Sequence, residues 1–131
     1  MSPPRVDALD HLVLTVRDME ATVRFYTQVL GMQLERFGEG RLALRFGSQK
    51  INLHPAEAPL QPHAARPTAG SGDLCLRTRR PPAEWVGHLA ALDVSVELGP
   101  VARTGAEGPM TSLYVRDPDG NLVEIGYYGE E

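Results

Sequence analysis

The order of secondary-structure signals in the first half of the chain recurs in the second half. Residues 9–54 carry a strand pattern, an amphipathic helix pattern and then three short strand patterns. From residue 73 the same order begins again. A sheet built from two such units turns one concave face inward. The sequence therefore predicts an α+β fold in which two βαβββ modules form a curved eight-stranded mixed sheet around a cleft.

The repeat also divides the chain, with a first module at about residues 7–54, a connection at about 55–72 and a second module at about 73–128. Together they make a single domain over residues 1–131. Asp18 is the expected N-cap of the first helix, and Pro81-Pro82 opens the second. The expected strands are 9–16, 33–37, 42–46, 50–54, 73–77, 94–98, 111–115 and 121–127. Residues 99–109 contain several glycines and are predicted to form a second long loop.

Two ionisable side chains fall on mostly apolar strand faces. The turn Asp117-Pro118-Asp119-Gly120 leads into a strand on which Glu124 shares one face with Leu122, by the period of two. His11 shares a face with Leu9 and Val13 in the same way. Burying either group is costly unless it is paired, hydrogen-bonded or bound to a cation. Glu124 and His11 are therefore candidate ligands, with a solvated face and a carbonyl-bonded core histidine as the structural alternatives.

When the modules are superposed by element, Asp73 takes the place of His11 and Asn52 takes roughly the place of Glu124. These four side chains can converge on the concave face. Asp73 follows Gly70-Ser71-Gly72, so turn capping is as good an account of it as metal ligation. Asn52 is also explained by a structural role.

Composition limits the partners of the chain. It has 42% hydrophobic and 23% charged residues and a formal net charge of −4 without a basic run, which argues against nucleic acid and anionic membrane surfaces. Cys75 is the single cysteine, so no intramolecular disulfide is expected. The N-terminal residues carry no apolar signal or membrane-spanning pattern, and a cytoplasmic protein that binds a small molecule is predicted.

The chain resembles the vicinal-oxygen-chelate superfamily, which includes glyoxalase I, extradiol dioxygenases, fosfomycin-resistance thiol transferases and bleomycin-binding proteins. Three stretches carry the resemblance: Leu9-Asp10-His11-Leu12, Phe25-Tyr26-Thr27-Gln28-Val29-Leu30-Gly31-Met32 and Asp117-Pro118-Asp119-Gly120-Asn121-Leu122-Val123-Glu124. Two further segments, 45–54 and 103–109, look most like the small single-domain glyoxalase domain-containing and virulence-associated group. These motifs are specific for the fold and weakly specific for the reaction.

The resemblance implies a divalent-metal site with His11 and Glu124 as ligands. Asp73 stands where glyoxalase I and the fosfomycin enzymes have a histidine, and Asn52 stands where glyoxalase I has a glutamate. His54, two residues beyond Asn52 on the same face, is a substitute ligand or base. This oxygen-rich set suits Mn²⁺, Fe²⁺, Ni²⁺ or Zn²⁺.

In the superfamily's shared chemistry, the metal chelates two adjacent substrate oxygens. Glu124, Asp73 and His54 are the expected catalytic residues, the last two as alternative bases. Asn52 and Arg103 are the expected substrate contacts. Arg103 is placed near a substrate carboxylate, with a solvent-facing arginine as the alternative.

Two classes of function follow. One is a metal-dependent lyase, isomerase, dioxygenase or thiol transferase, and the other is a metal-free protein that sequesters a drug or another small molecule, as in bleomycin resistance. The resemblance also implies a homodimer, with modules packed edge to edge or exchanged between subunits. In the exchanged form, His11 and Glu124 come from different chains.

Overall fold

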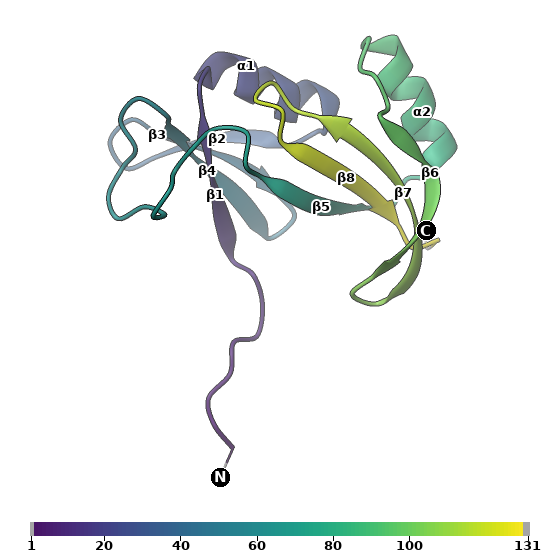
Figure 1. Ribbon diagram of the computed structural model, residues 1–131, viewed down its shortest axis with the longest axis horizontal. Coiled ribbons are helices and arrows are strands. Elements are labelled where there is room, and N and C mark those ends of the chain that lie inside the picture. Colours follow the sequence, from purple (N-terminus) through teal and green to yellow (C-terminus); the bar gives the residue numbers. More distant parts are fainter. Residues whose placement is uncertain (1, 130–131) are drawn as a thin grey trace.

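The computed structural model describes residues 2–129 and has the two predicted modules (Figure 1). The first module contains β1 (His11–Val16), α1 (Met19–Arg24), a π-helical turn (Phe25–Val29), β2 (Gln33–Phe37), β3 (Arg41–Phe46) and β4 (Gln49–Pro55). The second contains β5 (Asp73–Thr78), α2 (Pro82–Ala91), β6 (Leu98–Gly105), β7 (Gly108–Arg116) and β8 (Leu122–Tyr127). The predicted fold class is confirmed.

The eight strands lie in two four-stranded mixed sheets of the same topology. Their orders are β1-β4-β3-β2 and β5-β8-β7-β6, and no strand of residues 2–129 pairs across the two sheets. The opening strand of each module runs parallel to the closing strand, and the remaining pairs are antiparallel. The predicted curved surface is therefore built from two sheets, with β1 and β5 each at the edge of its own sheet.

The second module departs from the prediction at β6. Residues 94–97, expected as most of a strand, precede β6, and the predicted loop 99–109 is instead the β6–β7 hairpin. The glycines of this segment led to the prediction of a loop. They lie instead at a register shift between Leu98 and Val101 and at the hairpin turn, where Gly108 has φ +127°. The residues between those points are extended and pair with β7. Arg103 thus lies on a strand.

The first helix begins as predicted, with the Asp18 side chain accepting a hydrogen bond from the Ala21 amide at 3.0 Å. After Arg24 the helix widens into the π-helical turn. Tyr26, in this turn, is completely buried. The helix thus presents an aromatic side chain to the core at the point where the two modules meet.

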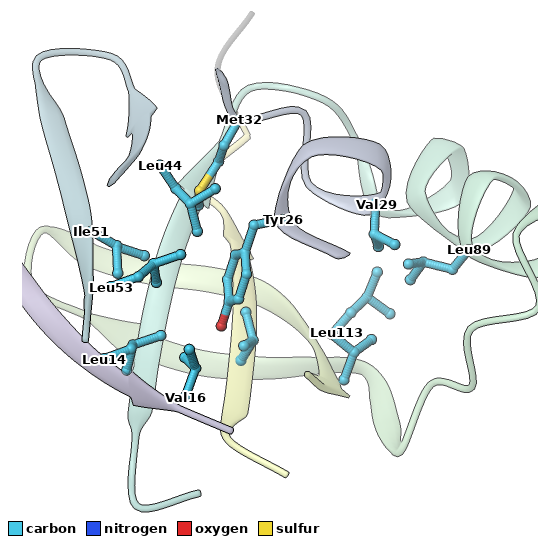
Figure 2. Close-up of a cluster of buried hydrophobic side chains, with 12 residues drawn as sticks. Leu14, Val16, Tyr26, Val29, Met32, Leu44, Ile51, Leu53, Leu89 and Leu113 are labelled. Carbon is cyan, nitrogen blue, oxygen red and sulfur yellow. The ribbon is translucent and has the colours of Figure 1, made fainter. Parts of the chain in front are cut away.

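A single hydrophobic core joins the modules behind the sheets. Figure 2 shows Tyr26 among core side chains of both modules, including Leu14 and Ile51 from the first and Leu89 and Leu113 from the second. The helices α1 and α2 lie on this side of the sheets (Figure 1). Because strand side chains alternate, the opposite face of each sheet is left to carry the candidate site residues.

The Asp117 turn is fixed to the first module and to the start of β5. The Tyr26 hydroxyl donates to Asp117 Oδ2 at 2.8 Å. The Asn121 amide donates to the same oxygen at 2.7 Å and accepts from the Gly72 backbone N–H at 2.6 Å. Burial, together with the Asp117 carboxylate, raises the pKa of Tyr26 far above its usual range. These bonds set where β8, and with it Glu124, begins.

No helix within residues 2–129 is long and apolar enough to cross a membrane.

Candidate functional site

Strand register supports the predicted equivalence of the two modules. His11 pairs with Lys50, two residues before Asn52 on β4. In the second module, Asp73 pairs with Leu122, two residues before Glu124 on β8. Asp73 therefore occupies the backbone position of His11, and Glu124 that of Asn52, as the sequence indicated.

Three of the side chains considered from the sequence line one cavity of about 430 Å³ in the second module. They are Glu124, Arg103 and Cys75, from β8, β6 and β5. The complete lining is Cys75, Arg77, Arg103, Thr104, Gly105, Ala106, Glu107, Met110, Tyr114, Glu124 and Tyr128. Its volume is within the range of small-ligand sites. We call it the module-2 cavity.

Glu124 is half-buried and faces Cys75, its direct partner on β5. Burial raises the pKa of the Cys75 thiol to about 11, helped by the charge of Glu124 and by a hydrogen bond to it. Asp73 lies two residues before Cys75 on the same sheet face, and it pairs with Leu122, two residues before Glu124. The two carboxylates of the predicted ligand set are thus diagonal neighbours on adjacent strands.

Arg103 is held against the wall of the module-2 cavity. Its Nε donates to the Tyr114 hydroxyl at 2.9 Å and its Nη1 donates to the Ala102 carbonyl at 3.0 Å. Its guanidinium carbon is 5.4 Å from the centre of the Tyr114 ring. The remaining N–H donors leave the side chain able to bind a substrate carboxylate.

Sequence reasoning missed a second arginine in this cavity. Arg77 forms an ion pair with Glu107 at 2.9 Å, and its guanidinium carbon lies 4.5 Å from the centre of the Tyr128 ring. The period of two on β5 places Arg77 on the face of Asp73 and Cys75, and this signal was available in the sequence.

His11 begins β1 in the first module, and its side chain is partly exposed. Its Nδ1 lies 2.8 Å from Asp10 Oδ1. A carboxylate in this position holds the proton on Nδ1 and leaves Nε2 as the ligating atom, which is the common arrangement around metal-bound histidines. Lys50 beside it is 3.9 Å from Glu35, which also pairs with Arg45.

Asn52 and His54 follow on the same face of β4, and both are buried. Neither Asn52 Oδ1 nor His54 Nδ1 has a hydrogen-bond partner. His54 lies four positions after Lys50, the partner of His11, so it is about 13 Å from His11 along the strand direction at about 3.3 Å per residue. His54 therefore belongs to a different part of the face from His11.

The described chain does not gather the predicted ligands into one cluster. Within residues 2–129, no three His, Cys, Asp or Glu side chains form a group that could hold a metal ion. Asp73, Glu124 and Arg103 lie in the second module, whereas His11, Asn52 and His54 lie in the first. The candidate residues thus form two groups, on equivalent sheet faces of the two modules.

The two modules of the same topology are those of a known class of protein. The chain matches the Glyoxalase/Bleomycin resistance protein/Dioxygenase superfamily over residues 8–125, and it belongs to that superfamily. It is 51% identical over 123 residues to the virulence protein STM3117 of Salmonella typhimurium, covering 94% of this chain and 85% of the relative. The crystal structure of STM3117 superposes with a TM-score of 0.94 over 95% of this chain and 99% of the other.

The chain is also similar to a glyoxalase domain-containing protein and to a lyase. The glyoxalase domain-containing protein RDO1 of Mycosarcoma maydis is 51% identical over 123 residues, covering 94% of this chain and 69% of RDO1. Lactoylglutathione lyase from Agrobacterium tumefaciens is 27% identical, with a TM-score of 0.72 over 98% of this chain and all of the other. The superfamily therefore includes enzymes, and many of its members bind small molecules.

Proposed function

We propose that this protein is a divalent-metal-dependent, glyoxalase-like enzyme that acts on a small carboxylate-bearing compound with two adjacent oxygens. The observation that carries the proposal is the module-2 cavity, which brings the carboxylate of Glu124 together with Arg103. A carboxylate available to a cation and an arginine available to an anion, in one cavity, suit a substrate that is bound at both ends.

The donor groups fit a divalent cation. Asp10 orients His11 with Nε2 free, and neither Asp73 nor Glu124 forms an ion pair within residues 2–129. One imidazole and two carboxylates are suitable ligands for Mn²⁺, Fe²⁺, Ni²⁺ or Zn²⁺. A cation held by these residues would supply Lewis-acid polarisation of two adjacent substrate oxygens.

The other residues bind substrate and move the proton. Arg103, fixed by Tyr114, binds the substrate carboxylate. Asn52 has a side-chain oxygen without a partner and accepts a hydrogen bond from a substrate hydroxyl. If Asp73 stays outside the ligand shell, it is the favoured base because it shares the face of Glu124. His54, in the other module, is the second base candidate.

The two groups of candidate residues are proposed to meet between two copies of the chain. His11 of one copy would join Asp73 and Glu124 of the other, as in an exchanged C₂ dimer. The two-fold symmetry of such a dimer gives two identical sites. The position of the predicted ligands on two separate sheets supports this arrangement.

Metal content is the first test. Tag-free protein purified without chelators is analysed for transition metals, alongside His11→Ala, Glu124→Gln and the control Glu39→Gln. Glu39 is an exposed carboxylate in the β2–β3 turn, outside the proposed site. Near-stoichiometric metal is expected in the wild type and in the control, with loss in the other two variants because each removes one ligand.

Wild-type protein that takes up no metal on titration with Mn²⁺, Fe²⁺, Ni²⁺ or Zn²⁺ would contradict the proposal. It would leave the metal-free, small-molecule binding protein as the function to pursue. With metal bound, a panel of small hydroxy- and keto-carboxylates identifies the substrate. Arg103→Gln is expected to raise KM for the compounds that carry a carboxylate, since it removes their binding partner.

A further inference from the structure

A second cavity lies in the first module, on the face of β1 and β4 and beneath the connection between the modules. It has a volume of about 310 Å³ and is lined by Val13, Thr15, His54, Pro62, His63, Ala64 and Pro67. An adjoining cavity of about 290 Å³ shares four of these residues, Val13, Thr15, Ala64 and Pro67. We call the first of them the module-1 cavity. It is large enough for a compound of the size of one ring.

The roof of this cavity is tied down at both ends. The Ala56 amide donates to the Val16 carbonyl at 2.8 Å where the connection leaves β4. At the other end, Gly72 accepts from the Leu122 amide at 3.0 Å and donates to the Asn121 side chain. The connection therefore crosses the sheet face between two fixed points, and its prolines and alanine form an apolar wall over the cavity.

His54 supplies the unpaired polar group of the cavity. It is only 4% exposed, and its Nδ1 is buried without a hydrogen-bond partner. Buried side-chain nitrogens are normally paired, so an unpaired one on a residue that lines a cavity indicates a partner supplied from outside the chain. Burial lowers the pKa of His54, and the nearby charges of Arg41 and His63 lower it further, which favours the neutral ring.

The other histidine of the cavity is already engaged. His63 Nδ1 lies 2.8 Å from the Ala64 carbonyl, and the His63 side chain is exposed. The remaining walls are apolar apart from the Thr15 hydroxyl. Arg41, whose charge acts on His54, stacks on Phe37 with its guanidinium carbon 4.7 Å from the ring centre. The cavity thus offers one buried, unpaired ring nitrogen within mostly apolar surroundings.

We propose that the module-1 cavity binds a small uncharged compound that has a ring-sized apolar body and a hydroxyl group, with the hydroxyl hydrogen-bonded to His54. The apolar walls favour the body of such a compound over water. The hydroxyl satisfies the buried nitrogen, which an apolar compound cannot do. This site shares only His54 with the proposed metal-dependent site, where the ring is the second base candidate, and it needs neither a metal nor a second chain.

Phenol and toluene, which differ only in a hydroxyl against a methyl group, are the probes. The full-length, metal-free protein is labelled with ¹⁵N, and each compound is titrated while the His54 ring nitrogens and the backbone amides of Val13 and Thr15 are followed by NMR. Phenol is expected to give saturable shifts at these three residues. Toluene is expected to bind about tenfold more weakly because it leaves the buried nitrogen unpaired.

Two variants sharpen the comparison. His54→Phe keeps a ring in place but removes the acceptor, and it is expected to weaken phenol binding about tenfold. His63→Gln is the matched control, because the His63 Nδ1 is already bonded to the chain, and a change below about threefold is expected. Far-UV circular dichroism verifies the fold of both.

Three results would overturn the proposal. They are no saturable shift at His54 in the wild type, equal affinities for phenol and toluene, or a His63→Gln effect as large as that of His54→Phe. The first two are measured on the wild-type protein, so they decide the question even if His54→Phe does not fold. A failure of metal binding leaves all three readouts unaffected.

Discussion

Tyr26 makes one polar contact, with Asp117, from within the apolar core. Its hydroxyl bonds Asp117, and Tyr26→Phe removes this bond without changing the ring. Asp117 keeps its bonds from the Asp119 amide and from Asn121. A lost hydrogen bond to a charged group costs about 1.5–3 kcal/mol, and we expect the free energy of unfolding to fall by that amount in urea titrations.

Tyr127→Phe is the control for this change. The Tyr127 hydroxyl makes no hydrogen bond within residues 2–129, and its side chain is only partly buried. Its removal is expected to change stability by less than about 0.5 kcal/mol. Equal effects of the two substitutions would show that the Tyr26–Asp117 bond adds nothing beyond the burial of the ring.

The raised pKa of Tyr26 predicts a loss of stability at alkaline pH. Folded Tyr26 keeps its proton, whereas in the unfolded chain the phenol ionises near pH 10. Above that pH the unfolded state binds fewer protons than the folded state, so the free energy of unfolding falls by about 1.4 kcal/mol per pH unit. The free energy of unfolding, measured between about pH 9 and 11.5, should fall more steeply with pH in the wild type than in Tyr26→Phe. Parallel curves would contradict the prediction.

Among the structural elements, the end of the inter-module connection lies in close backbone contact with the turn before β8. Gly70 has φ +87°, and a Cβ there would lie 2.7 Å from the Asp119 carbonyl oxygen. Gly120 has nearly the same φ, +88°, with nothing within 4 Å of a Cβ. Alanine would introduce the same backbone strain at both positions, but only at Gly70 would its Cβ also clash with the Asp119 carbonyl oxygen.

This pair gives a matched test. Gly120→Ala is expected to cost about 1–2 kcal/mol, the cost of left-handed backbone for an L-residue. Gly70→Ala should cost more, because the Asp119 carbonyl must also move and it belongs to the turn that positions β8. Urea unfolding of both variants measures the difference. Similar losses would show that the connection yields at Gly70 without disturbing the turn.

The same elements show what the sequence could reveal. Period-two patterns located β1, β4, β5 and β8 closely enough to assign Asp73 and Glu124 to one face. This was possible because one face of each strand is apolar and the other carries polar side chains. The patterns failed at β6, where glycines mark a register shift and a hairpin turn rather than a loop. For that reason Arg103 was predicted to lie on a loop, whereas it lies on β6 and lines the module-2 cavity.

At the scale of the whole molecule, the division of the candidate site between two sheets was beyond sequence reasoning. The pattern within each module fixes which residues share a face, but the position of one module relative to the other depends on side-chain packing across the common core. Tyr26, Leu89 and Leu113 meet in that core although they are far apart in the sequence. The sequence left edge-to-edge and exchanged dimers equally open for this reason.

Mixing two variants that lack metal distinguishes edge-to-edge dimers from exchanged dimers. His11→Ala and Glu124→Gln proteins are each expected to lack metal. If His11 and Glu124 act across the dimer, a mixed dimer has one site with both changes and one intact site. Random reassociation gives half mixed dimers, so about a quarter of all sites should recover metal after co-refolding, by the symmetry of a C₂ interface. If both residues act within one chain, every chain carries a change and no site recovers. Refolding each variant alone is the control.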